Sequence, residues 1–246
     1  MPRRGLLSRL LYPARVPDPE DELDAEELEL WVEAADRDYF AGLDSEFVER
    51  ARGLGVSGGM ILDLGSRLGL APMKILWEEE NFLAIGVYRT LEMAESARQT
   101  AEAWNLGERM FFQVGEPGQM RFKTAYFDLV VSDGALHRFE DPPAVLDEIG
   151  RVAKPSGAIL VRDLRRPGRL RMSRHMAAHR ARYPEGLRDR FEAGVRAGFT
   201  PDEMVALVEA SGLERARVLA DETHVLVERR GADDPGSWVA ERERYR

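Results

Sequence analysis

The feature of this sequence that most constrains its fold is a mostly apolar run, Met60 to Leu64, that leads into two glycines and a proline. The run shows no polar alternation, which is typical of a strand buried on both faces of a parallel sheet. Gly65 and Gly69 let the backbone turn tightly, and Pro72 suits the first turn of a helix. This order of strand, glycine loop and helix predicts an α/β domain in which a ligand binds against the helix N-terminus.

The spacing of the glycines narrows the class of ligand. A dinucleotide site needs the pattern G-x-G-x-x-G, and that pattern is absent because Arg67 stands between Gly65 and Gly69. The stretch instead resembles motif I of the class I S-adenosylmethionine (SAM)-dependent methyltransferases, in which an acidic residue and any residue precede G-x-G-x-G. Asp63, Gly65 and Gly69 fill three of its four defining positions, and Arg67 replaces the middle glycine. An ordinary strand-to-helix turn is the alternative interpretation of this loop alone.

The resemblance continues from about residue 55 to residue 229. It is strongest in Ala125–Pro142, which resembles the fourth strand of the family and its loop, and in Leu146–Gly157, which resembles the next helix and turn. The resemblance implies a Rossmann-like α/β fold with a seven-stranded, mostly parallel sheet and helices on both faces. The implied strand order is 3-2-1-4-5-7-6, with strand 7 antiparallel. The leader segment Ala35–Phe40 is similar to that of small-molecule methyltransferases.

The resemblance also implies a cofactor, SAM, and the residues that would hold it. In the family, an acidic residue at the end of the second strand accepts hydrogen bonds from both ribose hydroxyls, and a loop after the third strand contacts the adenine. Here Tyr88 and Arg89 follow the second strand, and Glu116 and Pro117 follow the third. The predicted cofactor-binding residues are Asp63, Gly65, Ser66, Arg67, Gly69, Tyr88, Arg89, Glu116, Pro117 and Ser132.

Three of these residues depart from the family pattern. Arg67 places a long cationic side chain where glycine leaves room for a cationic cofactor. Tyr88 cannot accept two hydrogen bonds as a carboxylate does, and Pro117 has no backbone N–H to offer the adenine. We therefore predict that the isolated chain binds SAM weakly or not at all. In the alternative, Arg67 pairs with the cofactor carboxylate while Tyr88 or Arg89 stacks on the adenine, and binding survives.

The candidate catalytic residues follow the predicted fourth strand, whose carboxyl end lies where open α/β sheets bind their ligands. Asp133 or His137 would face a methyl acceptor, and His137 would either act as its general base or shape the pocket. A structural histidine bonded to nearby backbone is the alternative. His175 and His179 are four residues apart, but the glutamate of the zinc motif and a third ligand are missing, so no metal site is predicted.

Composition limits the remaining functions. A net charge of −9 argues against a general nucleic-acid binder, and the sequence indicates no export signal or transmembrane segment, so we expect a cytoplasmic protein. The basic stretch Arg162–Arg190 is predicted to be helical and to cover the mouth of the cleft. Two functions remain. One is methyl transfer to a small-molecule acceptor, and the other is a non-catalytic binding or assembly module with a protein partner.

The sequence also predicts how the chain is divided. Residues 1–54 form an N-terminal leader and a helical cap, residues 55–230 form the methyltransferase-like domain, and residues 231–246 form a polar tail. Because 44% of the residues are apolar, the chain can fill the core of one sizeable domain.

Overall fold

The fold is given by a computed structural model that describes residues 10–18, 25–35 and 38–231. The first part of the predicted leader and the predicted tail after residue 231 lie outside the described residues. The strands are β1 (Gly59–Leu64), β2 (Phe82–Tyr88), β3 (Met110–Val114), β4 (Phe127–Asp133), β5 (Ala153–Leu164), β6 (Arg217–Ala220) and β7 (His224–Arg229). The helices are α2 (Ala25–Ala35), α3 (Asp38–Arg52), α4 (Leu70–Glu78), α5 (Leu91–Ala103), α6 (Pro142–Val152), α7 (Arg169–Arg180), α8 (Arg188–Ala197) and α9 (Pro201–Ala210). Short 3-10 helices are η1 (Arg67–Gly69), η2 (Leu136–Arg138) and η3 (Glu185–Leu187).

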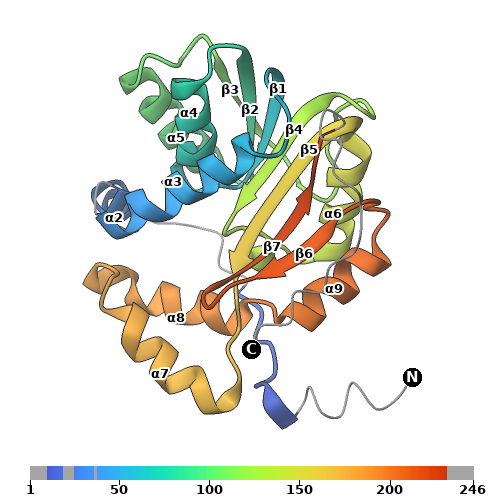
Figure 1. The fold of residues 1–246 in the computed structure, drawn as a ribbon. Helices are drawn as coiled ribbons and strands as arrows, with labels where there is room; N and C mark the ends of the chain where they lie inside the picture. The colour runs from blue at the N-terminus through green and yellow to red at the C-terminus, as the bar shows by residue number, and fades with distance from the viewer. Residues whose placement is uncertain (1–9, 19–24, 36–37, 232–246) are drawn as a thin grey trace.

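The strands form one seven-stranded sheet in the order β3-β2-β1-β4-β5-β7-β6. β1 lies parallel to β2 and β4, whereas β7 lies antiparallel to β5 and β6. The predicted fold, strand order and antiparallel last strand are confirmed (Figure 1). The carboxyl ends of β1, β4 and β5 meet at one edge of the sheet, and β7 begins at that edge because it runs in the opposite direction.

Helices cover both faces of the sheet (Figure 1). Side chains alternate along β1, so Ile61 joins the core beneath α3, α4 and α5, while Leu62 joins the core beneath α6 and α9. Both side chains are fully buried, as the apolar run predicts. A third cluster around Trp31, Leu187 and Phe191 connects α2 with η3 and α8.

Local sequence signals set the starts of two helices. Asp141 caps α6 by accepting a hydrogen bond from a backbone N–H, and Thr200 caps α9 in a capping box with Glu203. The stretch Arg162–Arg190 forms the end of β5, α7, η3 and the start of α8, so most of it is helical as predicted. In the part of the chain that the structure describes, no helix is both long and apolar enough to cross a membrane.

Candidate functional site

A cavity of about 80 Å³ lies at the carboxyl edge of the sheet, and we call it the edge cavity. Its polar lining residues are Asp44, Ser66, Asp133, Arg162 and His224, and its apolar lining residues are Trp31, Phe40, Leu43, Leu68, Leu70, Ala71, Leu164 and Tyr183. A smaller cavity of about 30 Å³ contains His137 and shares Trp31, Leu164 and Tyr183 with the edge cavity. The two predicted catalytic residues therefore line neighbouring cavities.

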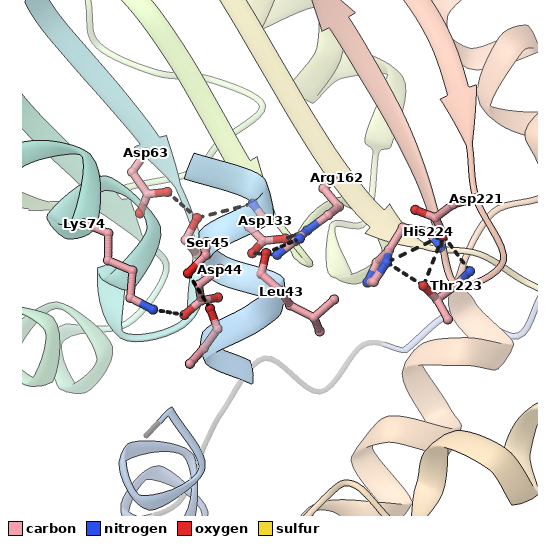
Figure 2. A network of polar contacts seen from close by, with 12 residues as sticks. Leu43, Asp44, Ser45, Asp63, Lys74, Asp133, Arg162, Asp221, Thr223 and His224 are labelled. Atoms are coloured by element: carbon pink, nitrogen blue, oxygen red, sulfur yellow. Dashed lines mark hydrogen bonds and ion pairs between the residues drawn. The ribbon is translucent and has the colours of Figure 1, made fainter. Parts of the chain in front are cut away.

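Asp133, at the end of β4, is paired with Arg162 of β5 (Figure 2). Arg162 donates from Nε to one carboxylate oxygen at 2.7 Å and from Nη2 to the other at 2.6 Å. Its Nη1 donates to the carbonyl of Leu43 at 2.7 Å, and the guanidinium lies 4.9 Å from the ring centroid of Phe47. A bidentate pair of this kind fixes both side chains. Both carboxylate oxygens of Asp133 thus already accept hydrogen bonds.

Asp63 is completely buried beneath the glycine loop. It accepts a hydrogen bond from the hydroxyl of Ser66, which in turn accepts one from the backbone N–H of Asp133 at 3.3 Å. The hydroxyl of Tyr88 donates to the other carboxylate oxygen of Asp63 at 3.4 Å. Burial raises the pKa of Asp63 to about 7, although the bonds from Ser66 and Tyr88 act to lower it. Asp63 and Ser66 of the predicted cofactor motif therefore bond to each other and to residues at the ends of β2 and β4.

Tyr88, at the end of β2, points into the core and is only 1% exposed. It packs in a cluster that includes Met73 and Met110. A Cβ added at Gly86 would lie 2.7 Å from the Tyr88 ring, and one added at Gly69 would lie 2.7 Å from its hydroxyl. The ring thus passes over one glycine and ends against the other. It fills the space between β2 and the glycine loop.

Gly65 has a φ of 65°, in the left-handed region that favours glycine, so the predicted tight turn forms. A Cβ added there would lie 3.2 Å from Cβ of Ala135 and 3.4 Å from the ring of Phe139. Arg138 donates to the carbonyl of Gly65 at 3.2 Å. Gly65, Arg138 and Phe139 face the end of β2 across a space of about 10 Å³, which we call the strand-2 cleft. A space of that size holds about one water molecule.

Of the remaining predicted cofactor residues, Arg89 and Pro117 border the strand-2 cleft, whereas Ser132 lies inside the sheet. Arg89 and Glu116 approach to 3.9 Å between Nε and Oε2, and Pro117 lines the strand-2 cleft. Ser132 is buried and donates to a carbonyl of β1 at 2.9 Å, so its hydroxyl joins two strands. Arg67 lies in η1, and the prediction about its side chain falls outside what the structure describes.

His137 lies in η2 and is 4% exposed. Its Nδ1 is 2.5 Å from Oδ1 of Asp163, and its backbone N–H donates to Oδ2 of the same carboxylate at 2.7 Å. Because the carboxylate accepts, the proton of the neutral imidazole lies on Nδ1 and Nε2 is the basic nitrogen. A Cβ added at Gly194 of α8 would lie 3.3 Å from Nε2, so this nitrogen faces α8 and the smaller cavity.

Several polar residues of the site were not among the predicted ones, including Arg162, Asp163, Asp44 and His224. The first two end β5 at the carboxyl edge, so the rule that selects Asp133 on β4 also applies to them. The rings of His175 and His179 lie with centroids 4.5 Å apart and with their planes tilted by 41°. Among the described residues, no group of three His, Asp or Glu side chains is arranged to hold a metal ion.

The sequence matches a family profile over more than half of its length and a curated relative over a shorter part. A profile of the family described as "Methyltransferase domain" matches residues 56–211. The uncharacterized protein YafE of Escherichia coli K12 is 31% identical over 90 residues, which is 36% of this chain and 43% of that protein. The chain thus spans less than half of the length of that relative.

Several solved structures share the fold. A candidate SAM-dependent methyltransferase of Methanococcus maripaludis superposes with a TM-score of 0.66 at 18% identity, covering 89% of this chain and 99% of that one. A SAM-dependent methyltransferase of Aquifex aeolicus gives a TM-score of 0.61 at 16% identity, covering 84% and 98%. At such low identity, the likeness establishes the architecture alone.

Proposed function

Because the chain belongs to the class I SAM-dependent methyltransferase superfamily, we propose that it binds a small molecule in the edge cavity and has little affinity for SAM in isolation. SAM, the cofactor of this family, supplies a methyl group from a sulfonium centre. The proposal rests on one observation, the unequal space along the carboxyl edge. About 80 Å³ is open beside Asp133 and Arg162, but only about 10 Å³ is open at the strand-2 cleft.

The residues of the strand-2 cleft do not fit the adenosine part of SAM. Tyr88 offers no carboxylate to the ribose, and its hydroxyl is already directed at Asp63. Each charged hydrogen bond lost without replacement costs about 1.5–3 kcal/mol, and the N–H missing at Pro117 costs about 0.5–1.5 kcal/mol more. Losses of this size move a micromolar affinity to about millimolar or weaker. Closure of the cleft over Gly65 weakens binding further.

The edge cavity suits a small molecule. Most of its lining side chains are apolar and a few are polar, which is typical of small-molecule sites. Figure 2 shows four of the polar groups, with Asp133 and Arg162 between Asp44 and His224. These groups are ordered by their own contacts, so they offer a bound molecule fixed partners.

Methyl transfer to that small molecule is the second candidate, and the geometry of His137 favours it. With its Nδ1 held by Asp163, Nε2 is positioned to take a proton from an acceptor hydroxyl or amine in the adjoining cavity. Asp133 would then orient Arg162 and would not act as the base. A protein partner, a cytoplasmic location and the three-part division of the chain stay predictions.

Calorimetric titration with SAM and with S-adenosylhomocysteine separates the two candidates. We expect the unaltered chain to bind both at about millimolar Kd or weaker. The double variant Arg67→Gly, Tyr88→Asp should bind SAM more tightly, because it removes the ring from Gly69 and restores a ribose acceptor. Tyr88→Phe is the control, since it keeps the ring in place and restores no acceptor. Low-micromolar binding of SAM by the unaltered chain would overturn the proposal and support methyl transfer.

A further inference from the structure

His224 is one of the polar groups that line the edge cavity, and its own hydrogen bonds say which kind of group it can bind. It is the first residue of β7 and stands opposite Leu164, the last residue of β5. Because β7 runs antiparallel, its first side chain reaches the edge at which β4 and β5 end. His224 therefore lines the cavity beside Arg162, and only 12% of its side chain is exposed (Figure 2).

A chain of hydrogen bonds fixes the proton of His224. Oδ1 of Asp221 accepts from the backbone N–H groups of Thr223 and His224, both at 2.7 Å, and lies 3.1 Å from Oγ1 of Thr223. Burial acts to raise the pKa of Asp221, but these donors lower it below its usual value, so the carboxylate is ionised and only accepts. The Thr223 hydroxyl must then donate to Asp221 and accept from Nδ1 of His224, 2.8 Å away.

The opposite nitrogen of the ring, Nε2, is therefore the acceptor. A neutral imidazole with its proton on Nδ1 has a lone pair on Nε2. Burial and the nearby Arg162 cation lower the pKa of His224, which keeps the ring neutral. No hydrogen bond from the described part of the chain reaches Nε2, and the ring borders the edge cavity.

We propose that His224 accepts a hydrogen bond from a hydroxyl or amine of a small neutral molecule in the edge cavity, whose aromatic or alkyl body contacts the apolar wall. The inference rests on the proposed function, because it takes the edge cavity as the small-molecule site. The wall includes Trp31, Phe40 and Tyr183, whose rings meet edge to face with centroids 5.0 to 6.0 Å apart. Such a wall suits a planar apolar body.

The charges around the cavity favour a neutral ligand. Asp133 is paired with Arg162, and Asp44 is paired with Lys74 at 2.9 Å, so the two carboxylates already face cations. A charged ligand would bring one more charge into a largely buried space, which is unfavourable without a partner. A ligand with no donor group would leave the Nε2 lone pair of His224 without a hydrogen bond.

Phenol and anisole are matched probes, because anisole replaces the hydroxyl hydrogen of phenol with a methyl group. Each is titrated into the full chain labelled with ¹⁵N, and the ring nitrogens of His224 and the backbone amides are followed by NMR. We expect phenol to bind about tenfold more tightly than anisole, because only phenol donates to Nε2. We also expect phenol alone to shift the Nε2 resonance strongly, and the spectrum of the free protein to show the proton on Nδ1.

The variants Thr223→Val and Thr223→Ser test the hydrogen-bond chain. Valine removes the hydroxyl at similar volume, so Nδ1 of His224 loses its hydrogen-bond acceptor and the ring proton is no longer fixed on that nitrogen. The preference for phenol should therefore disappear. Serine keeps the hydroxyl and should keep the preference. Equal binding of both probes to the unaltered chain, or a preference that survives Thr223→Val, would overturn this inference and leave the cavity as a small-molecule site. Binding of neither probe would overturn both this inference and the proposed function.

Discussion

The buried carboxyl group of Asp63, at the end of β1, makes the stability of the fold depend on pH. Burial raises the pKa of this carboxyl group from 3.8 to about 7. Between about pH 4 and pH 7 the folded chain holds a proton on Asp63 that the unfolded chain has released. The free energy of unfolding therefore falls as the pH rises through this range, and it levels off above about pH 7. The slope approaches about 1.4 kcal/mol per pH unit for this one group. We predict that Asp63→Asn gains stability relative to the unaltered chain across this window.

Urea denaturation at several pH values measures that gain. The difference in free energy of unfolding between Asp63→Asn and the unaltered chain should grow from about pH 4 to about pH 7 and then stay constant. Asp202→Asn, at an exposed carboxylate in the first turn of α9, is the control and should give a difference that does not grow between about pH 5 and 7. A constant difference for Asp63→Asn would mean that its carboxyl group is ionised throughout.

The conformation of Tyr88 shows what residue-by-residue comparison with a family leaves open. The sequence predicts the loss of an acceptor, because a tyrosine stands where the family has an acid. It does not reveal that Gly86 and Gly69 leave room for the ring, since this space exists only after β2 packs against the glycine loop. Similarly, sequence places Asp133 at the carboxyl edge, but its pairing with Arg162 depends on the register that sets these two residues side by side.

At the scale of elements, the buried parallel strands could be predicted because they form continuous apolar runs. β5 differs, since its apolar pattern predicts a strand over Ala158–Val161, whereas the strand begins at Ala153. The segment Lys154–Gly157 has the composition of a turn, but Phe127 pairs with Ala153 before a shift in register, which keeps the segment extended. The position of His224 depends on the antiparallel pairing of β7 with β5, and no local pattern indicates that contact.

The capping box at the start of α9 allows a local sequence signal to be tested. Oγ1 of Thr200 accepts from the N–H of Glu203 at 3.2 Å, and the Glu203 carboxylate accepts from the N–H of Thr200 at 2.9 Å. Thr200→Ala removes the first bond at a buried position and should lower the free energy of unfolding by about 1–2 kcal/mol. Thr200→Ser keeps the hydroxyl and should lose less than half as much in urea denaturation. Equal losses would assign the effect to packing of the threonine methyl group.

The edge cavity depends on the whole molecule, because its lining comes from distant parts of the sequence. Glu27 of α2 and Arg190 of α8 form two hydrogen bonds of 2.7 Å, and each side chain is 19% exposed. Arg15 donates to the carbonyls of Ala197 and His137 at 2.6 and 2.8 Å. The first part of the described chain is thereby attached to α8 and to the loop after β4. We call α2 and α8 the roof helices, because α2 contributes Trp31 to the edge cavity and α8 contributes Phe191 and Gly194 to the smaller cavity beside it.

Hydrogen exchange in α2 should report on how firmly the roof helices hold together. Arg190→Met removes the two hydrogen bonds to Glu27, worth about 1 kcal/mol for a pair partly screened by solvent, so amide exchange in α2 should become about fivefold faster. Exchange in β1 and β4 should not change, because those strands open only with the whole fold. Arg196→Met is the matched control, since Arg196 pairs with Glu192 within α8. If β1 exchanged faster by the same factor, the Glu27–Arg190 pair would stabilise the entire domain, and the roof helices would not open independently of the sheet.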